Sequence, residues 1–379
     1  MKVGVDARHL AAGRGVAHYT RGALAALAAA HPQDEWRCFV PGRAPVDAPA
    51  ADNVVLVRDR RPGRIVFGAA ALLRRPRLDR LLGGDLDVVW LPAPAPVALS
   101  AGMPYVLTVH DLSWEERPRD FTGYERRWHR LARPPALGRG AARVSAVSRV
   151  TADLAIASWS LDPDRVSVAS PGLAPAEDPV GPRPDGVPDR YLLFVGALEP
   201  RKGPDLLAVA YARARTAGLD IPLVVVGDGR LRSAFDGLPD TTLLATVSRA
   251  ELAALYAGAT AVVAPSWLEG FGFVPLEAAV HGTPAVLSAL PVFAETLEDH
   301  ALYVPAGDAE ALSAALVKVV LDPARRRATG ELAGQRAATF TWEACAAGLY
   351  PALAGAAGLA PDALDADEPD GPAGPEATA

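Results

Sequence analysis

The chain has 379 residues, of which 50% are hydrophobic and 22% charged, and a formal net charge of -6. This composition excludes a disordered chain, and the length exceeds the roughly 250 to 300 residues at which one core stops growing, so two domains are expected. The charge is uneven: residues 1–175 carry 24 Lys/Arg against 17 Asp/Glu, residues 176–360 carry 14 against 21, and residues 361–379 carry only acidic charges. No nucleic-acid partner is expected of such an acidic chain.

The two cysteines, Cys38 and Cys345, lie far apart and neither belongs to a CxxC motif, so neither a disulfide framework nor a zinc site is indicated. Residues 1–6 enter a strand pattern directly, without a signal peptide. The longest uncharged run, 344–361, is rich in Ala and Gly and too weakly apolar to span a bilayer. We therefore expect a cytoplasmic protein.

A strand, a glycine turn and a helix open the chain, at residues 2–6, 13–15 and 16–30. Further β-rich runs follow, separated in most places by helix-like stretches: 36–40, 53–57, 88–91, 105–109 and 144–147. Alternation of this kind predicts a mostly parallel sheet with helices on both faces, which binds ligands at the carboxyl ends of its strands. We assign residues 1–172 to this first domain.

A second series of the same kind begins after a Pro/Gly-rich stretch, in which we place a linker at 173–190. Its strands are predicted at 191–196, 223–227, 242–245, 261–264, 285–287 and 302–304, and its helices at 204–217, 249–258, 275–281 and 309–321. Ser248 and Glu251 form a capping box for one of these helices. The sequence thus predicts two doubly wound, Rossmann-like α/β domains facing a cleft, the second spanning 191–340.

The end of the chain falls into two parts. Thr341 can cap a last helix, 341–360, which we expect to return to the first domain. Residues 361–379 are acidic and rich in Pro and Gly, which predicts a disordered tail.

Two carboxylates, Glu269 and Glu277, flank a glycine-bearing turn between a buried strand and a helix that Pro275 is expected to begin and Gly282 to end. Such a turn points backbone N–H groups and the positive end of a helix dipole at a ligand. Gly270 and Gly272 let the backbone approach closely, and the carboxylates can accept hydrogen bonds from hydroxyls. A nucleotide sugar, with phosphates and many hydroxyls, fits best, although alone an ordinary helix start explains so short a motif better.

Basic and polar side chains follow other predicted strands at the same kind of edge. Arg201 and Lys202 come after the strand at 191–196 and can neutralise a diphosphate, although a surface turn is the simpler explanation for the pair alone. His110 follows the strand at 105–109 and could act on a sugar hydroxyl, or simply be a loop histidine. Ser148 is either a cleft residue or the N-cap of the next helix.

Two further features have simpler explanations. Asp85-Leu86-Asp87 resembles a metal-binding DxD motif but precedes its strand instead of following it, so we predict a solvated loop and no metal. Residues 58–80 carry eight arginines against two aspartates around an apolar segment. A solvated helical face explains this pattern best, while contact with anionic lipid or an acidic acceptor also fits. Residues 117–143 have the mixed charges of a surface helix.

Taken together, Glu269 to Glu277, the Arg201-Lys202 pair, His110 with Asp111, the glycine turn and Ser148 resemble the retaining glycosyltransferases of family 4 (glycosyl transferases group 1), which have the GT-B fold. The resemblance covers about residues 1–355. It departs from the family at two places. Of the family's Gly-Gly-x-Gly turn only Gly15 is retained, and the family's Pro-Asn-Gly is Pro171-Gly172 here, without the asparagine.

The resemblance implies roles for individual residues. Glu269 would contact the donor sugar, Glu277 the ribose, Arg201 and Lys202 the diphosphate, and His110 the transferred sugar. The other residues expected to bind the donor are Gly15, Val247, Gly270, Phe271, Gly272, Phe273 and Val274. No metal and no separate cofactor are implied, because the nucleotide sugar is a co-substrate.

The implied reaction is retaining transfer of a hexose to a glycan, lipid-linked or small-molecule acceptor, with peripheral contact at the inner membrane face left open by the basic first domain. GDP-mannose is the expected donor, because variants with Glu-Pro-Arg-Lys resemble mannosyltransferases. Glucosyl and N-acetylglucosaminyl donors fit nearly as well. A nucleotide-sugar epimerase and a non-catalytic GT-B subunit are the alternatives.

Overall fold

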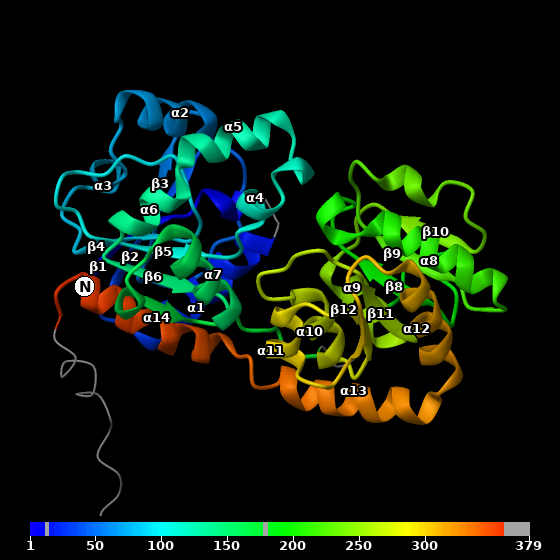
Figure 1. The fold of residues 1–379 in the computed structure, drawn as a ribbon. Coiled ribbons are helices and arrows are strands. Elements are labelled where there is room, and N and C mark those ends of the chain that lie inside the picture. Colours follow the sequence, from blue (N-terminus) through cyan, green and yellow to red (C-terminus); the bar gives the residue numbers. More distant parts are fainter. Residues whose placement is uncertain (12–14, 177–180, 360–379) are drawn as a thin grey trace, which may run out of the picture.

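The computed structural model describes residues 1–11, 15–176 and 181–359, which form two parallel sheets covered by helices (Figure 1). The first sheet has seven strands in the order β3-β2-β1-β4-β5-β6-β7. Its strands are β1 (Lys2–Asp6), β2 (Glu35–Pro41), β3 (Val54–Asp59), β4 (Val88–Leu91), β5 (Tyr105–Val109), β6 (Arg143–Ala146) and β7 (Val166–Val168). Each strand pairs in parallel with its neighbours.

The second sheet has six parallel strands in the order β10-β9-β8-β11-β12-β13. They are β8 (Leu192–Val195), β9 (Leu223–Val226), β10 (Thr241–Leu244), β11 (Ala261–Ala264), β12 (Ala285–Ser288) and β13 (Leu302–Val304). The central strands β9, β11 and β12 are buried along their whole length, which is why they are continuous apolar runs rather than alternating patterns.

Helices cover both faces of the first sheet. They are η1 (Arg8–Ala11), α1 (Gly15–Ala30), α2 (Gly63–Leu73), α3 (Leu78–Leu81), α4 (Ser113–Glu116), η2 (Pro118–Asp120), α5 (Gly123–Ala132), α6 (Pro134–Gly140), α7 (Arg149–Trp159) and η3 (Pro163–Arg165). Ser148 caps α7 by accepting a hydrogen bond from the Thr151 N–H. The mixed-charge region 117–143 is therefore not one surface helix but several short ones, broken where Arg133 adopts the left-handed conformation before Pro134.

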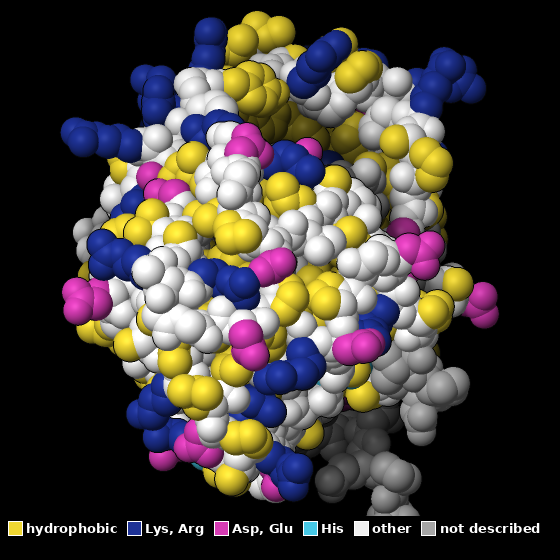
Figure 2. All heavy atoms as spheres, turned by 90° about the vertical axis from the view of Figure 1, so that its right-hand side faces the viewer, with side chains coloured by type: hydrophobic (Ala, Val, Ile, Leu, Met, Phe, Trp, Pro, Cys, Tyr) yellow, Lys and Arg dark blue, Asp and Glu magenta, His cyan; other side chains and the backbone are white. Residues whose placement is uncertain are grey.

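The second sheet is covered in the same way by η4 (Pro200–Lys202), α8 (Pro204–Thr216), η5 (Arg232–Phe235), α9 (Arg249–Gly258), α10 (Phe273–Val280), α11 (Pro291–Leu297), α12 (Ala309–Leu321) and α13 (Pro323–Ala337). The predicted capping box of Ser248 and Glu251 is present at α9. On the face that carries α8 and α12, Lys/Arg and Asp/Glu side chains lie interspersed (Figure 2).

The last helix, α14 (Trp342–Ala356), returns to the first domain as predicted. It runs beneath the first sheet, next to α1, and connects to α13 under the second sheet (Figure 1). Thr341 caps α14 by accepting from the Ala344 N–H. The buried Tyr350 hydroxyl of α14 donates to Asp34, which follows α1, at 3.0 Å.

The architecture is the predicted one, but not every element was anticipated. Three elements, β7, α11 and α13, were not predicted from the sequence. The prediction that Pro275 begins α10 was wrong, because the helix begins two residues earlier, at Phe273, after Gly272 with φ of 90°. Proline is tolerated at the third position because the first four N–H groups of a helix have no intrahelical partner. The domain limits remain predictions, and the tail 361–379 lies outside the described residues.

None of the helices in the described part of the chain is long and apolar enough to cross a membrane.

Candidate functional site

The turn between β11 and α10 leaves backbone N–H groups free at the carboxyl edge of the second sheet. Gly272 reverses the chain with a positive φ that glycine adopts easily. Within the described residues, the N–H groups of Phe271, Gly272, Phe273 and Val274 make no hydrogen bond. Free N–H groups beside the positive end of a helix dipole are suited to an anion, and anion binding at this turn stays a prediction.

Glu269 lies in this turn and contacts Lys202 of η4. That both bind one ligand stays a prediction. The Lys202 Nζ forms an ion pair with Glu269 Oε1, and the Ser266 hydroxyl donates to the same oxygen at 2.8 Å. Glu269 Oε2 has no partner among the described residues and can accept from a ligand hydroxyl. Burial lowers the pKa of Lys202, while Glu269 and Asp111 oppose that shift.

Arg201 lies beside the same turn with its guanidinium unoccupied. In the described part of the chain this side chain makes no hydrogen bond or ion pair, so its donors are available to a ligand. Its backbone is fixed, because the Trp267 N–H donates to the Arg201 carbonyl at 2.8 Å. A Cβ at Gly203 would lie 2.2 Å from the Pro265 carbonyl oxygen, so η4 approaches the turn more closely than another residue would allow.

Glu277 lies on α10, half-buried, and accepts a hydrogen bond from the Tyr256 hydroxyl of α9 at 2.8 Å. Burial raises the pKa of Glu277 to about 7, and the Tyr256 hydrogen bond and Arg249 counteract this effect. Val247 is half-buried between β10 and α9, against the apolar cluster that includes Tyr256 and Val274. The site therefore has a second carboxylate whose ionisation is poised near neutral pH.

His110 follows β5 in the first domain and faces the same region. Its Nε2 lies 2.8 Å from the Pro92 carbonyl oxygen, and because a carbonyl only accepts, Nε2 carries a proton. Burial lowers the pKa of His110, so the neutral ring presents Nδ1 as an acceptor. The Tyr19 ring packs edge-on against it, with ring centroids 4.8 Å apart.

The two domains touch at Gly270. Its carbonyl accepts from the Ser148 hydroxyl at 2.7 Å and from the Thr151 hydroxyl at 3.1 Å. A Cβ built on Gly270 would lie 1.6 Å from the His110 carbonyl oxygen. Ser148 is thus the predicted N-cap of α7 and also contacts the second domain, where it is buried.

A second contact between the domains was not foreseen. Glu295 of α11 accepts from the N–H groups of Arg149 and Val150 at 2.7 and 2.9 Å. A carboxylate at the first turn of α7 is favoured by the helix dipole. No sequence signal identifies Glu295, because only the folded chain places α11 at the start of α7.

A buried charged cluster at the carboxyl end of β1 was also missed. Arg8 pairs with Asp6 at 3.2 Å, donates to the Pro94 carbonyl at 3.1 Å and lies next to His9. Burial raises the pKa of Asp6 and lowers those of Arg8 and His9. The strand-end rule that singled out His110 applies equally to Asp6, which ends β1.

Gly15 begins α1 and its neighbourhood is open, since a Cβ there would meet no atom within 4 Å. The rest of the glycine turn, residues 12–14, lies outside the described residues. Asp85 and Asp87 bind Lys2, at 2.6 Å to its Nζ and 2.7 Å to its N–H respectively, so they lie at the amino edge of the first sheet as predicted. Within residues 1–11, 15–176 and 181–359, no group of three or more His, Cys, Asp or Glu could hold a metal.

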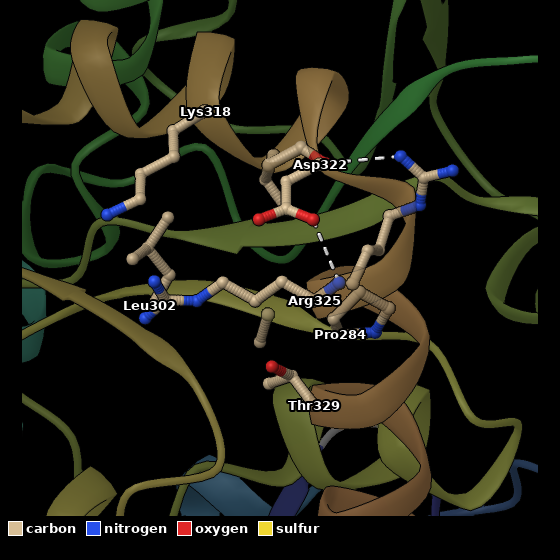
Figure 3. Close-up of a pocket in the computed structure, with 9 residues that line it drawn as sticks. Pro284, Leu302, Lys318, Asp322, Arg325 and Thr329 are labelled. Carbon is tan, nitrogen blue, oxygen red and sulfur yellow. Dashed lines mark hydrogen bonds between the residues drawn. The ribbon is translucent and has the colours of Figure 1, made fainter.

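A small hollow at the amino ends of β12 and β13 does not compete with this site (Figure 3). Its volume is about 20 Å³, enough for about one water molecule. Asp322 accepts from the Arg325 N–H at 2.9 Å and caps α13, and the Arg326 guanidinium donates to two carbonyls of α12. These polar groups therefore stabilise the junction between α12 and α13.

Two family models match the chain: Glycosyltransferase Family 4 over residues 13–177 and Glycosyl transferases group 1 over residues 184–336. A D-inositol 3-phosphate glycosyltransferase of Frankia alni is 32% identical over 307 residues, covering 70% of this chain and 73% of that protein. The chain spans about half the length of several other curated relatives of the same name.

Solved structures share the fold. Sucrose-phosphate synthase from Thermosynechococcus elongatus superposes with a TM-score of 0.72 at 19% identity, covering 92% of this chain and 97% of that one. Anabaena Alr3699/HepE, solved in complex with UDP and glucose, has a TM-score of 0.67 at 18% identity, covering 93% and 99%.

Proposed function

Because the chain belongs to the family 4 glycosyltransferases (glycosyl transferases group 1), we propose that it transfers a sugar from a nucleotide diphosphate sugar to an acceptor held mainly by the first domain. One observation carries the proposal. The Lys202–Glu269 pair, the N–H groups of residues 271–274 and the backbone of Arg201 meet at one turn, which touches the first domain at the His110 carbonyl. In the described part of the chain, those N–H groups and the Arg201 guanidinium have no hydrogen-bond partner.

Each group has a distinct part in this proposal. Arg201 and Lys202 bind the diphosphate, and the unpartnered oxygen of Glu269 accepts a hydroxyl of the donor sugar. Glu277, deeper on α10, accepts from the ribose. His110 contacts the transferred sugar through Nδ1, the nitrogen that Pro92 leaves free.

The chemistry follows from where charge develops. Breaking the bond between the anomeric carbon and the leaving oxygen places positive charge on the sugar and negative charge on the diphosphate. Fixed donors around that diphosphate stabilise the transition state most directly. Arg201, Lys202 and the turn N–H groups are such donors, and they need no metal ion. We further propose transfer with retention at the anomeric carbon, as the resemblance implies.

The donor base and the acceptor are separate proposals. GDP-mannose remains the first donor to test, and UDP-glucose the second, since UDP and glucose occupy the HepE structure. The relatives named for D-inositol 3-phosphate make a phosphorylated polyol the first acceptor to test. Free, buried thiols at Cys38 and Cys345 favour a reducing cytoplasm as its location.

The test is an incubation of the full chain with GDP-mannose, UDP-glucose and UDP-N-acetylglucosamine, each with and without inositol phosphate. We expect release of nucleoside diphosphate only when an acceptor is present, in equal amount to a glycosylated product seen by mass spectrometry. An isomerised sugar nucleotide formed without acceptor would support an epimerase instead. Thermal stabilisation by nucleotide sugars without turnover on any of a broad acceptor set would indicate a binding subunit.

A further inference from the structure

A large cavity opens in the first domain between α2, α5, α6 and the loop that joins β4 to β5. Its volume is about 730 Å³, within the range of about 300 to 1,000 Å³ that small-molecule pockets occupy. Apolar side chains line it, among them Val97, Leu99 and Met103. Leu72 and Leu73, which stand in the sequence between the lining residues Ala71 and Arg74, are 75% and 73% exposed.

Of the described residues, four arginines and no carboxylates line the same cavity: Arg74, Arg77, Arg133 and Arg165. Within the described residues, the side chains of Arg74, Arg77 and Arg133 make no hydrogen bond or ion pair, whereas Arg165 donates to a backbone carbonyl at 3.2 Å. The Asp79 carboxylate is buried and accepts a hydrogen bond from the Ser100 N–H at 2.8 Å. The cavity thus combines apolar side chains with positive charge that no described carboxylate neutralises.

Arg74 and Arg133 occupy backbone positions that favour glycine. Both end helices in the left-handed conformation, with φ of 53° and 49°. Residues at this C-terminal position are most often glycine, because a Cβ is penalised there. Two arginines at such positions on one cavity indicate that their side chains do something a glycine would not.

This cavity is separate from the donor site. It is lined by Pro104, Tyr105 and Ala142, at the amino ends of β5 and β6, whereas His110 follows the carboxyl end of β5. The length of that strand, roughly 15 Å for five residues, separates the two ends.

We propose that the arginine-lined cavity binds an amphipathic anion, an aliphatic chain that ends in a phosphate or carboxylate. The chain lies on the apolar lining, and the arginines bind the anionic end as planar, permanently charged donors. A free amphiphile and a lipid drawn from a membrane share this chemistry.

The probe is decyl phosphate below its micellar concentration, titrated calorimetrically into the full chain. We expect Arg74→Gly and Arg133→Gly to bind it at least tenfold more weakly while their melting temperatures stay equal to the wild type or rise, because glycine relieves the backbone. Loss of affinity with gain of stability is a combination that a purely structural arginine would not give.

Matched controls separate charge from backbone effects. Ser160→Gly removes another left-handed residue, at φ of 53° outside the cavity, and Arg43→Gly removes an exposed charge of the same domain. Both should bind the probe like the wild type. Inorganic phosphate and decanol, each offering one half of the ligand, should bind at least tenfold more weakly than decyl phosphate.

Two outcomes would overturn the proposal: wild-type affinity in both arginine variants, or equal affinity for inorganic phosphate and decyl phosphate. Sedimentation with phosphatidylglycerol vesicles distinguishes the sources. Binding of the wild type but not of Arg74→Gly would support a membrane lipid, and probe binding without sedimentation would support a free amphiphile.

Discussion

The two edges of the cleft differ in how their charges are used. On the second domain, Arg201 and one oxygen of Glu269 have no partner in the described chain. On the first domain, Arg8 is paired with Asp6 and His110 Nε2 with Pro92. The second domain is therefore preorganised for an anionic ligand, whereas the charges that the first domain holds at this edge are already paired with each other. Donor binding should thus depend on a few charged residues, and acceptor choice on shape.

The largest effect should come from Arg201→Ala. Turnover should fall roughly 100- to 1,000-fold, as it does when one donor to a developing negative charge is removed. Arg213→Ala, an exposed arginine on α8, is the matched control and should be unaffected. Near-normal steady-state kinetics for Arg201→Ala would contradict the proposal that the unpaired charges of the second domain bind the donor.

Gly270→Ala tests the contact between the edges. The added methyl group would meet the His110 carbonyl oxygen, so the domains must separate. Misplacing reacting groups by about 1 Å can cost roughly 100-fold in rate. We expect kcat to fall by up to that factor while the affinity for nucleoside diphosphate is retained.

The control for this change is Gly68→Ala on α2, where a Cβ would meet no atom within 4 Å. Unchanged kcat in Gly270→Ala would show that the turn and His110 need not touch during turnover.

A smaller effect concerns pH and Glu277. Burial raises the pKa of Glu277 in the folded state to about 7, above the ordinary glutamate value of 4.5, so the folded state binds the proton more tightly than the unfolded state. Glu277 therefore contributes to the free energy of unfolding below about pH 4.5, and this contribution is lost as the pH rises towards 7. The loss is about 2 kcal/mol once the partial exposure of the side chain is allowed for. Glu277→Gln should flatten this part of a plot of unfolding free energy against pH. Parallel curves for both proteins would contradict the assignment.

Much of this site could be predicted because the ligand-binding edge of a parallel sheet can be located from each strand separately. Residues that follow a strand lie at the ligand-binding edge, and this rule located His110, Arg201 and Lys202 without knowledge of the fold. The same rule, applied to β1, would have located Asp6. The spacing of Glu269 and Glu277 across a strand, turn and helix also needed only local sequence.

Other features depend on how distant segments meet. From the sequence, Gly270 was expected to let the backbone approach a ligand closely. The structure shows a further constraint, because the His110 carbonyl leaves no space for a Cβ at this position. Glu295 has no local signature because its partners, the N–H groups of α7, belong to the other domain. The left-handed backbone of Arg74 and Arg133 is equally invisible, since sequence preference at those positions favours glycine.

The central claim, that the turn from Glu269 to Glu277 holds the sugar at one end and the ribose at the other, is tested most directly by comparing ligands. Dissociation constants would be measured for GDP, GDP-mannose, UDP and UDP-glucose with Glu269→Gln and Glu277→Gln. We expect Glu269→Gln to weaken only the intact nucleotide sugar, by roughly tenfold for a hydrogen bond to a charged group, and Glu277→Gln to weaken nucleotide and nucleotide sugar alike. Equal losses for both ligands in Glu269→Gln would contradict it.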